Sequence, residues 1–388
     1  MLDSFLRQVT KDSYGPISFP DKTQIPAVIH KFNDAFSTLG WGRMPDPIQN
    51  RGRVAAGIFA ELNFRYQSPE SWKAFLRSPD SLSFRKAGAS IAQGGSVSSM
   101  LNEISEKLPI QSNFLGVVDE KTFRSLQSGS VLTEAHLASP SALPMVYPVC
   151  EYFPEEKVVS TALMGRTVWD YSGWRSQSAP KMFPFEFLCH FVLNEESLSI
   201  LNVDHVAIPK TASLHTLQAG AAWDFPLIEL VLPQDPLERR IGLSEALWIT
   251  GLSASELQQM MLSAAWIAAW TRYQVREAGL NLESVQLKFA RSEGSQFVLV
   301  DAFSLEDLGL EKAGDRFQFE TANQFYKKTS WFDAVERAKK QAAHLGLSEW
   351  KRYCVEPAPW LDPKVKSRIE EEHKVLAQCF LGNSNHVL

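Results

Sequence analysis

The sequence predicts an α+β fold, and three observations support this class. Strand-like segments cluster early in the chain and recur between helices, without the regular strand–helix alternation of a parallel sheet. One long helix carries both a start and a stop signal, and a β-hairpin pattern follows directly after its stop. A chain of 388 residues is long enough for one large or two medium domains.

The N-terminal half contains short elements separated by turn residues. Turn signals fill roughly the first 45 residues, which we expect to be irregular or to form short strands. Ser68 before Pro69 is a helix start, with Ser68 as the cap and proline at the first helical position. The remaining patterns in this half predict strands over 52–64, 146–152 and 157–163, and a helix over 98–107.

The C-terminal half has clearer signals. Ser253 and Glu256 have the spacing of a capping box that opens a helix ending near residue 278, where Gly279 supplies the stop. Asp362 before Pro363 marks the start of a last helix, which either docks on the body or forms a dimer contact. Further patterns predict a buried strand over 183–192, a hairpin of strands 285–289 and 297–301, and a helix over 333–345.

The composition excludes several classes of protein. Lys and Arg number 39 against 44 Asp and Glu, so the basic excess typical of nucleic-acid binding is absent. The four cysteines form no C-x-x-C pair, which excludes a zinc ribbon or a thioredoxin motif. The N-terminal residues lack a signal-peptide pattern, and the most apolar stretch, 260–270, is too short to cross a bilayer. We therefore expect a cytoplasmic protein with no membrane or nucleic-acid partner.

Common catalytic motifs are missing from the sequence. It has no Walker A pattern, no G-x-G-x-x-G, no H-E-x-x-H and no G-x-S-x-G. His190 lies in an apolar strand pattern and is more typical of a core histidine than of a functional one. The 11 Trp, 24 Phe and 8 Tyr favour core packing over a stacking surface for a base or sugar.

The segment 279–304 nevertheless resembles a known family. It reads GLNLESVQLKFA and then LVDAFS, and the preceding stretches 184–190 and 238–246 read PFEFLCH and ERRIGLSEA. With the glycine turn and helix at 91–105, these stretches are similar, in order, to those of SAICAR synthetase (phosphoribosylaminoimidazole-succinocarboxamide synthase) over roughly residues 80 to 320. The resemblance implies a two-lobed architecture related to ATP-grasp and kinase folds. Its expected lobes are a sheet-rich one over 1–178 with an added N-terminal segment, and an α+β one over 179–388 with a helical extension.

The resemblance also implies a function and a site. Its members use ATP and magnesium to join a carboxylate to the amine of aspartate through an acyl phosphate. The matching positions imply catalytic roles for Glu186, Lys288 and Asp301, with Asp301 also the magnesium ligand, and we expect these three in the cleft between the lobes. Contacts to the nucleotide are implied for Gly95, Ser96, Gln286 and Lys288, and contacts to the substrate for His190, Glu238, Arg239 and Asp307.

Several positions depart from the family pattern. Ser284, Gln286 and Lys288 stand where the family has Asp, Lys and Glu, and Ala302 replaces the glutamate after Asp301. A lysine in place of a glutamate ligand reverses the charge where hard cations need oxygen ligands. Lys288 is expected either to form a cross-strand ion pair with Asp301 in place of the metal, or to replace the missing phosphate-binding lysine.

Three hypotheses follow. The first is a divergent ligase with a small-molecule nucleotide substrate, in monomeric or homo-oligomeric form. The second is a catalytically degenerate protein that keeps the fold and acts in binding or interaction, because a site rarely tolerates the loss of several charged groups. The third is an unrelated α+β protein, for which a structure without two lobes would be the sign.

Overall fold

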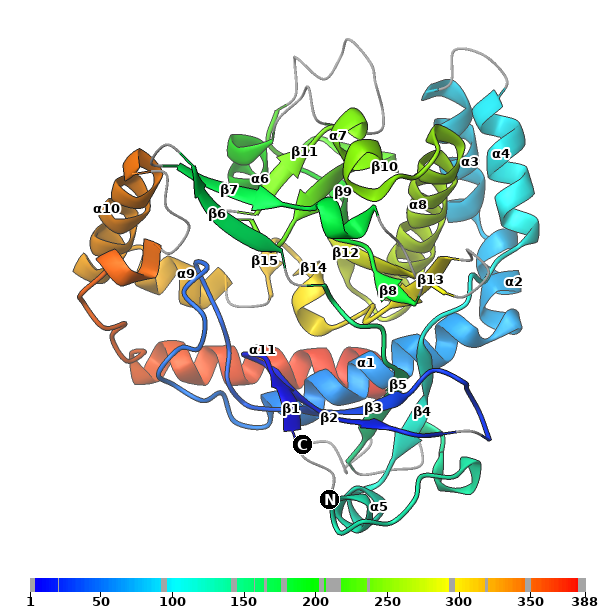
Figure 1. The fold of residues 1–388 in the computed structure, drawn as a ribbon, viewed down its shortest axis with the longest axis horizontal. Coiled ribbons are helices and arrows are strands. Elements are labelled where there is room, and N and C mark those ends of the chain that lie inside the picture. Colours follow the sequence, from blue (N-terminus) through cyan, green and yellow to red (C-terminus); the bar gives the residue numbers. More distant parts are fainter. Residues whose placement is uncertain are drawn as a thin grey trace.

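The computed structural model describes most of the chain. The described residues are 4–19, 21–91, 96–140, 145–156, 158–163, 166–175, 180–201, 206, 218–235, 238–292, 297–317, 320–345 and 350–382. Figure 1 shows a mixed α and β molecule in which a sheet built from the N-terminal part of the chain lies beside a larger sheet built from the second half. The predicted two-lobed α+β architecture is confirmed, together with its antiparallel sheets and the long helix in the C-terminal half.

The smaller sheet joins five of the described strands in the order β1-β2-β3-β5-β4, and all neighbouring pairs are antiparallel. Its strands are β1 (Ser4–Arg7), β2 (Lys11–Ile17), β3 (Ala27–Phe32), β4 (Phe114–Val118) and β5 (Tyr147–Glu151). Helix α1 (Arg51–Gln67) packs against β3, β4 and β5. The first 45 residues thus supply three strands, in agreement with the turn-rich sequence.

The larger sheet has the order β11-β10-β9-β12-β14-β15, and β8 and β13 also pair with β12. These strands are β8 (Lys181–Met182), β9 (Glu186–Val192), β10 (Ala222–Leu232), β11 (Arg239–Ile241), β12 (Asn281–Arg291), β13 (Phe297–Val300), β14 (Leu308–Lys312) and β15 (Asp315–Arg316). The predicted hairpin is confirmed as the antiparallel pair β12 and β13, with Lys288 opposite Val300. A separate two-stranded ribbon pairs β6 (Val159–Leu163) with β7 (Arg166–Asp170).

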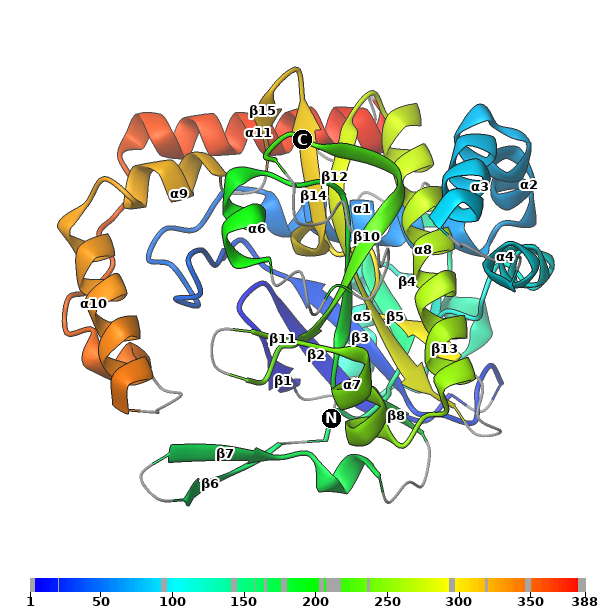
Figure 2. The same cartoon turned by 90° about the horizontal axis from the view of Figure 1, so that it is seen from above.

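Helices lie around the two sheets. Figure 2 shows α2, α3 and α4 at one end of the molecule, beside α8, and α9 and α10 at the other end. The helices after α1 are α2 (Pro69–Arg77), α3 (Pro79–Ile91), α4 (Ser96–Glu106), α5 (Glu120–Gln127), α6 (Glu195–Ile200), α7 (Leu243–Thr250), α8 (Ala254–Glu277), α9 (Glu320–Tyr326), α10 (Ser330–Leu345) and α11 (Pro363–Leu381). Short 3₁₀ turns occur at η1 (Glu134–His136), η3 (Ser172–Trp174), η6 (Leu305–Asp307) and η7 (Trp350–Tyr353).

The predicted helix boundaries are largely confirmed. Ser253 and Glu256 form the capping box of α8, and Gly279 follows this helix with φ +75°, a value that favours glycine. Asp362 caps α11, whose buried face includes Ile369 and Leu376 and packs on α1. The last helix therefore docks on the body of the same chain.

One prediction is wrong, since residues 52–64 form most of helix α1 rather than a strand. The segment is buried nearly all round, for example at Ile58, Phe59 and Leu62. A helix enclosed on several sides lacks a polar face, so its sequence shows no helical period and looks like a buried strand. The length of 17 residues and the alanines would have favoured the helix.

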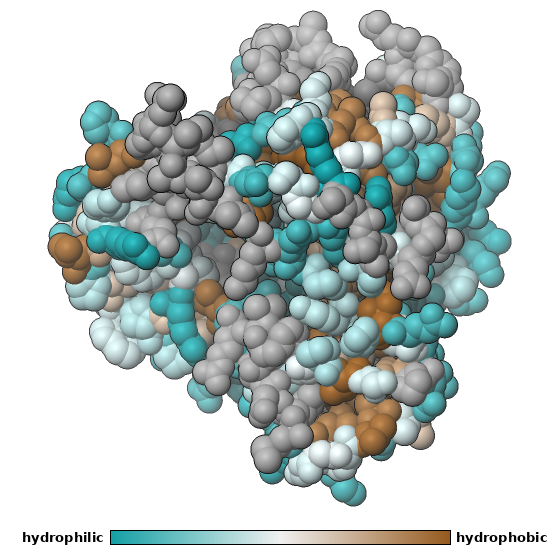
Figure 3. Space-filling model, in the orientation of Figure 1, coloured by the Kyte–Doolittle hydropathy of each residue, from teal (hydrophilic) through white to brown (hydrophobic). Residues whose placement is uncertain are grey.

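Surface and hydropathy agree with a folded globular chain. On the face shown in Figure 3, hydrophobic residues form small patches among hydrophilic ones. None of the described helices combines the length and apolar character that a membrane crossing requires.

Candidate functional site

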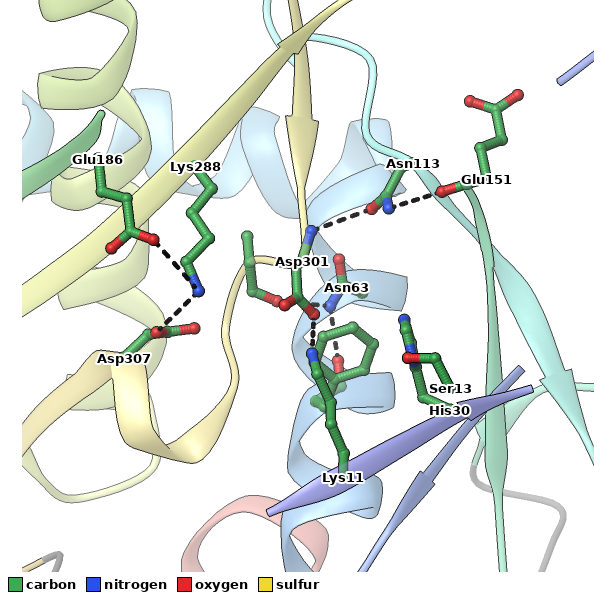
Figure 4. A network of polar contacts seen from close by, with 12 residues as sticks. Lys11, Ser13, His30, Asn63, Asn113, Glu151, Glu186, Lys288, Asp301 and Asp307 are labelled. Atoms are coloured by element: carbon green, nitrogen blue, oxygen red, sulfur yellow. Dashed lines mark hydrogen bonds and ion pairs between the residues drawn. The ribbon is translucent and has the colours of Figure 1, made fainter. Parts of the chain in front are cut away.

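Charged residues from both sheets gather where the sheets meet. An isolated bridge between Ser112 and Leu299 links the segment before β4 to β13 at this junction. Figure 4 shows side chains from β2, β3, β9, β12, the end of β13 and η6 pointing toward one another there. We name the group formed by Lys11, Glu186, Lys288, Asp301 and Asp307 the junction cluster.

One half of the junction cluster is centred on Lys288 of β12. Its Nζ lies 3.7 Å from Oε1 of Glu186 on β9 and 3.7 Å from Oδ1 of Asp307 in η6. Glu186 also accepts a hydrogen bond from the amide of Gln286, two residues before Lys288 on the same strand. The side chains of Glu186 and Asp307 are 11% and 9% exposed, so both carboxyls are largely removed from water.

Burial and charge shift the pKa values of this half in opposite directions. Burial raises the pKa of Glu186 to about 7, although the Lys288 ammonium opposes this shift. Burial likewise raises the pKa of Asp307. Burial alone would lower the pKa of Lys288, but the carboxylates of Asp307, Glu186 and Asp301 raise it, so Lys288 is a permanent cation.

The other half pairs Asp301 with Lys11. Lys11 of β2 donates to Oδ1 of Asp301, and its side chain is only 5% exposed. The Lys11 ammonium lies 5.7 and 5.8 Å from the ring centroids of Phe32 and Phe59, which enclose it. Burial would raise the pKa of Asp301, but Lys11, with Lys288 and His30, lowers it to about 2.

The backbone around Asp301 is strained and held by two amides. Asp301 has φ +51° and Phe303 has φ +69°, values that non-glycine residues rarely adopt. The Asp301 N–H donates to Oδ1 of Asn113 at 3.2 Å, and Nδ2 of Asn63 on α1 donates to the Ala302 carbonyl at 2.9 Å. Strain of this kind persists only where neighbours enforce it and is common at functional sites.

Lys288 and Asp301 do not form the expected cross-strand ion pair. Lys288 pairs with Glu186 and Asp307, and Asp301 pairs with Lys11. Asp301 comes after the last β13 residue that pairs with β12, and its left-handed backbone ends the regular strand geometry there. Lys288 still acts on Asp301 electrostatically, since it lowers the pKa of that carboxyl.

The structure brings only some of the expected site residues together. Glu186, Gln286, Lys288, Asp301 and Asp307 meet at the junction, although their roles stay predictions.

Other expected residues have partners elsewhere. His190, four residues beyond Glu186 on β9, has Nε2 3.1 Å from Oε2 of buried Glu229, as a core histidine would. Arg239 pairs with Asp235 and Glu245 near β11, and the neighbouring Glu238 is exposed with φ +50°.

The expected glycine turn and helix at 91–105 lie only partly within the described residues. Gly95 lies outside the described residues, and Ser96 is the first residue of α4, which packs on α3 and α8. Its nucleotide-binding role therefore stays a prediction.

Sequence reasoning missed Lys11 and the amides that hold Asp301. The sequence predicts irregular structure or short strands for the first 45 residues, and it does not indicate which partner a strand at Lys11 would have. Lys11 and Ser13 are both buried on β2, but lysine and serine are usually exposed, so the sequence carries no signal for this buried lysine. Asn113 and Asn63 have no sequence signal, since each acts through backbone groups far away in the chain.

The comparisons with known proteins agree with this architecture. No protein-family model matches the chain. A protein of Archaeoglobus fulgidus that is provisionally named phosphoribosylaminoimidazole-succinocarboxamide synthase is 24% identical over 215 residues, which are 55% of this chain and 63% of that protein. The chain thus matches less than two thirds of the length of this relative.

Solved structures show the same likeness in the fold. The SAICAR synthase of Saccharomyces cerevisiae, solved in complex with SAICAR, has a TM-score of 0.52 at 10% identity and covers 98% of this chain and 95% of its own. The corresponding synthase of Ehrlichia chaffeensis has a TM-score of 0.46 at 10% identity, over 89% of this chain and 98% of its own. At such identities the likeness concerns the fold alone.

Fold and site together define a class of protein: a two-lobed α+β chain with a lysine–carboxylate cluster where its two sheets meet. Within this class, the chain has a fold similar to that of the SAICAR synthase of Saccharomyces cerevisiae and a sequence similar to that of the Archaeoglobus fulgidus protein.

The junction cluster does not fit the magnesium ion that the resemblance implies. Mg²⁺ takes oxygen ligands in near-octahedral geometry and favours free carboxylates. Here each carboxylate of the cluster already has a lysine partner. Among the residues that the structure describes, no group of three or more His, Cys, Asp or Glu side chains is arranged to hold a metal.

Proposed function

We propose that the chain is a divergent carbon–nitrogen ligase of the SAICAR synthetase type. It would use ATP to join an amino acid, aspartate in the family, to the carboxylate of an imidazole ribonucleotide. The observation that carries the proposal is that five positions which the sequence resemblance assigns to the site meet at the junction from three separate segments. The sequence relative and the shared fold support the same reaction.

The junction cluster offers groups suited to such a ligation. The substrate carboxylate attacks the terminal phosphorus of ATP and ADP leaves; the amine then attacks the acyl carbon, and phosphate and a proton leave. The ammonium groups of Lys11 and Lys288 would attract the phosphates and the developing negative charge. Glu186, whose pKa is raised to about 7 by burial, is suited to accept the proton from the amine at neutral pH.

The test is direct ligation with purified protein. We expect ADP and a succinocarboxamide product, detected by mass spectrometry, when ATP, aspartate and the carboxylated imidazole ribonucleotide are supplied together. Glu186→Gln should lower kcat by about 10² or more if this carboxylate accepts the proton. Ser253→Ala, a change at the start of α8, is the matched control and should leave kcat unchanged.

A second function has its own supporting observation. Because lysines already compensate the carboxylates of the cluster, the site is also suited to a catalytically degenerate protein that binds a nucleotide without turning it over. Nucleotide binding with no ADP formation across a panel of carboxylates and amines would favour this alternative and contradict the ligase.

A further inference from the structure

A cavity of about 450 Å³ lies between helices α4 and α8, and its lining includes none of the five residues of the junction cluster. Figure 2 shows the two helices side by side, and they are in direct contact. The volume falls within the range of roughly 300 to 1,000 Å³ that is typical of small-molecule sites. The cavity is therefore a candidate binding site separate from the one described above.

One side of the cavity is apolar. Helix α4 contributes Met100 and Ile104, which lie one turn apart, and Ile110 and Phe297 come from the segments before β4 and at the start of β13. The ring of Phe297 is held by Phe183, whose centroid is 5.9 Å away. We name Met100, Ile104, Ile110 and Phe297 the apolar wall. A thioether and a phenyl ring both make favourable contacts with flat aromatic rings.

The other side of the cavity is polar. Gln259 and Ser263 lie one turn apart on α8, and Gln111 lies before β4; we name these three the polar wall. Within the part of the chain that the structure describes, no hydrogen bond joins their side chains to another group. On the same helix, by contrast, Thr271 donates its hydroxyl to the Ile267 carbonyl at 2.8 Å. Ser263 is only 6% exposed, so its hydroxyl gains most from a ligand that bonds to it.

The charged residues of the lining compensate each other. Glu103 and Lys107 lie at the solvent-exposed rim, and Nζ of Lys107 is 2.7 Å from Oε1 of Glu103. Their charges cancel, so the rim attracts neither an anion nor a cation strongly. The lining thus favours an uncharged ligand.

An apolar wall that faces unpartnered amides selects among uncharged molecules. An alkyl chain would leave two amides and a hydroxyl without partners, and a sugar would place hydroxyl groups against the apolar wall. A planar heterocycle has apolar faces and an edge of donors and acceptors. A glutamine amide, which both donates and accepts, pairs with such an edge in two hydrogen bonds.

We propose that the cavity between α4 and α8 binds an uncharged heteroaromatic ring of nucleobase or nucleoside size. The faces of the ring lie against the apolar wall and its edge bonds to the polar wall. This site goes beyond the proposed ligase reaction, because it shares no residue with the junction cluster.

The experiment uses adenosine as the probe, titrated calorimetrically into the full chain. We expect one saturable site with a dissociation constant below about 1 mM. Gln259→Met keeps the length of the side chain and removes the amide, and it should weaken binding about tenfold. The neighbouring Gln258 does not line the cavity, so Gln258→Met is the matched control and should leave the affinity unchanged.

A second variant guards against loss of folding. Circular dichroism melting shows whether each protein is folded. Ser263→Ala introduces a strong helix former, removes one hydroxyl, and should weaken adenosine binding about threefold or more. Adenosine binding that folded Gln259→Met and Ser263→Ala both leave unchanged would overturn the inference.

Competition separates this site from the proposed nucleotide site. Adenosine should bind with the same affinity in saturating ATP. If ATP instead displaces adenosine, the inference is wrong and the proposed nucleotide site is supported. If ATP binds and adenosine does not, the inference alone fails. If octanol binds and adenosine does not, the cavity is an apolar site and the inference is again wrong. If ATP does not bind, the nucleotide site fails while the adenosine titration still decides this question.

Discussion

At the scale of single residues, the buried ammonium of Lys11 is stabilised by one ion-pair partner, the carboxylate of Asp301. Lys11 and Asp301 are 290 positions apart, yet each is the immediate ion-pair partner of the other. Replacing one member of a buried pair leaves the other charge uncompensated, which costs far more than the pair itself contributes.

This pair gives the first prediction. Asp301→Asn and Lys11→Met should each lower the free energy of unfolding by about 3–5 kcal/mol. The double variant should lose less than the sum of the two, because neither charge is then stranded. Urea unfolding of the four proteins gives the coupling energy. A coupling near zero would contradict the buried pair.

A second prediction concerns Glu186 and pH. Its pKa is about 7 in the folded protein and 4.5 ordinarily, so between these values the folded state binds more protons than the unfolded state. This group's contribution to stability is therefore fully present below pH 4.5 and is lost as the pH rises through 7, by an amount on the order of 1–3 kcal/mol.

The measurement compares unfolding free energies of the unsubstituted protein and Glu186→Gln from pH 4.5 to 8. Their difference should change with pH in the stated direction. His30 and His373, whose pKa values burial lowers to about 3 and about 4, contribute an opposite trend to both proteins and cancel in the difference. A difference that is flat over this window would contradict the raised pKa.

At the scale of elements, local signals and burial account for different parts of the fold. Both ends of helix α8 are predicted from local chemistry. Ser253 and Glu256 accept hydrogen bonds from backbone N–H groups at its start, and Gly279 adopts the left-handed backbone that ends it. Helix α1 was read as a strand, because enclosure on several sides removed the polar face that reveals a helix.

The capping box gives a third prediction. The Ser253 hydroxyl accepts a hydrogen bond from the Glu256 N–H, and Glu256 accepts one from the Ser253 N–H at 2.7 Å. Ser253→Ala should cost about 1 kcal/mol of unfolding free energy. The exposed Ser255, two positions along the same turn, is the control, and Ser255→Ala should leave stability nearly unchanged or slightly raised.

At the scale of the whole molecule, one hydrophobic core joins the two sheets. The same cluster of buried residues includes Val28 of β3, Phe59 of α1, Trp266 of α8, Leu287 of β12 and Phe380 of α11. Segments from both ends of the sequence therefore share a core, as α11 on α1 shows. The lobe boundary near residue 178 stays a prediction.

A shared core gives the fourth prediction. Despite its two sheets, the protein should unfold in one cooperative transition, with equal calorimetric and van't Hoff enthalpies. Phe59→Ala, at a fully buried position, should cost about 3–5 kcal/mol and shift the whole transition to lower temperature. Scanning calorimetry checks this, and two separate transitions would show that the lobes unfold independently.

The sequence by itself determined what local chemistry controls. Capping residues, the glycine stop of α8 and the alternation of the β12–β13 hairpin act over a few residues and were readable directly. The collinear resemblance predicts Glu186, Lys288 and Asp301 in one cleft. In the structure, Lys288 lies within ion-pair distance of Glu186 and Asp307, and Asp301 pairs with Lys11.

Only the tertiary structure decided how the charges are paired. Lys11 reaches Asp301 because β2 and the end of β13 meet where the two sheets join, and Asn113 and Asn63 hold the strained backbone there from other segments. Lys288 pairs with Glu186 and Asp307 for the same reason. Electrostatic partners depend on distance and burial in space, and a pattern along the chain carries neither quantity.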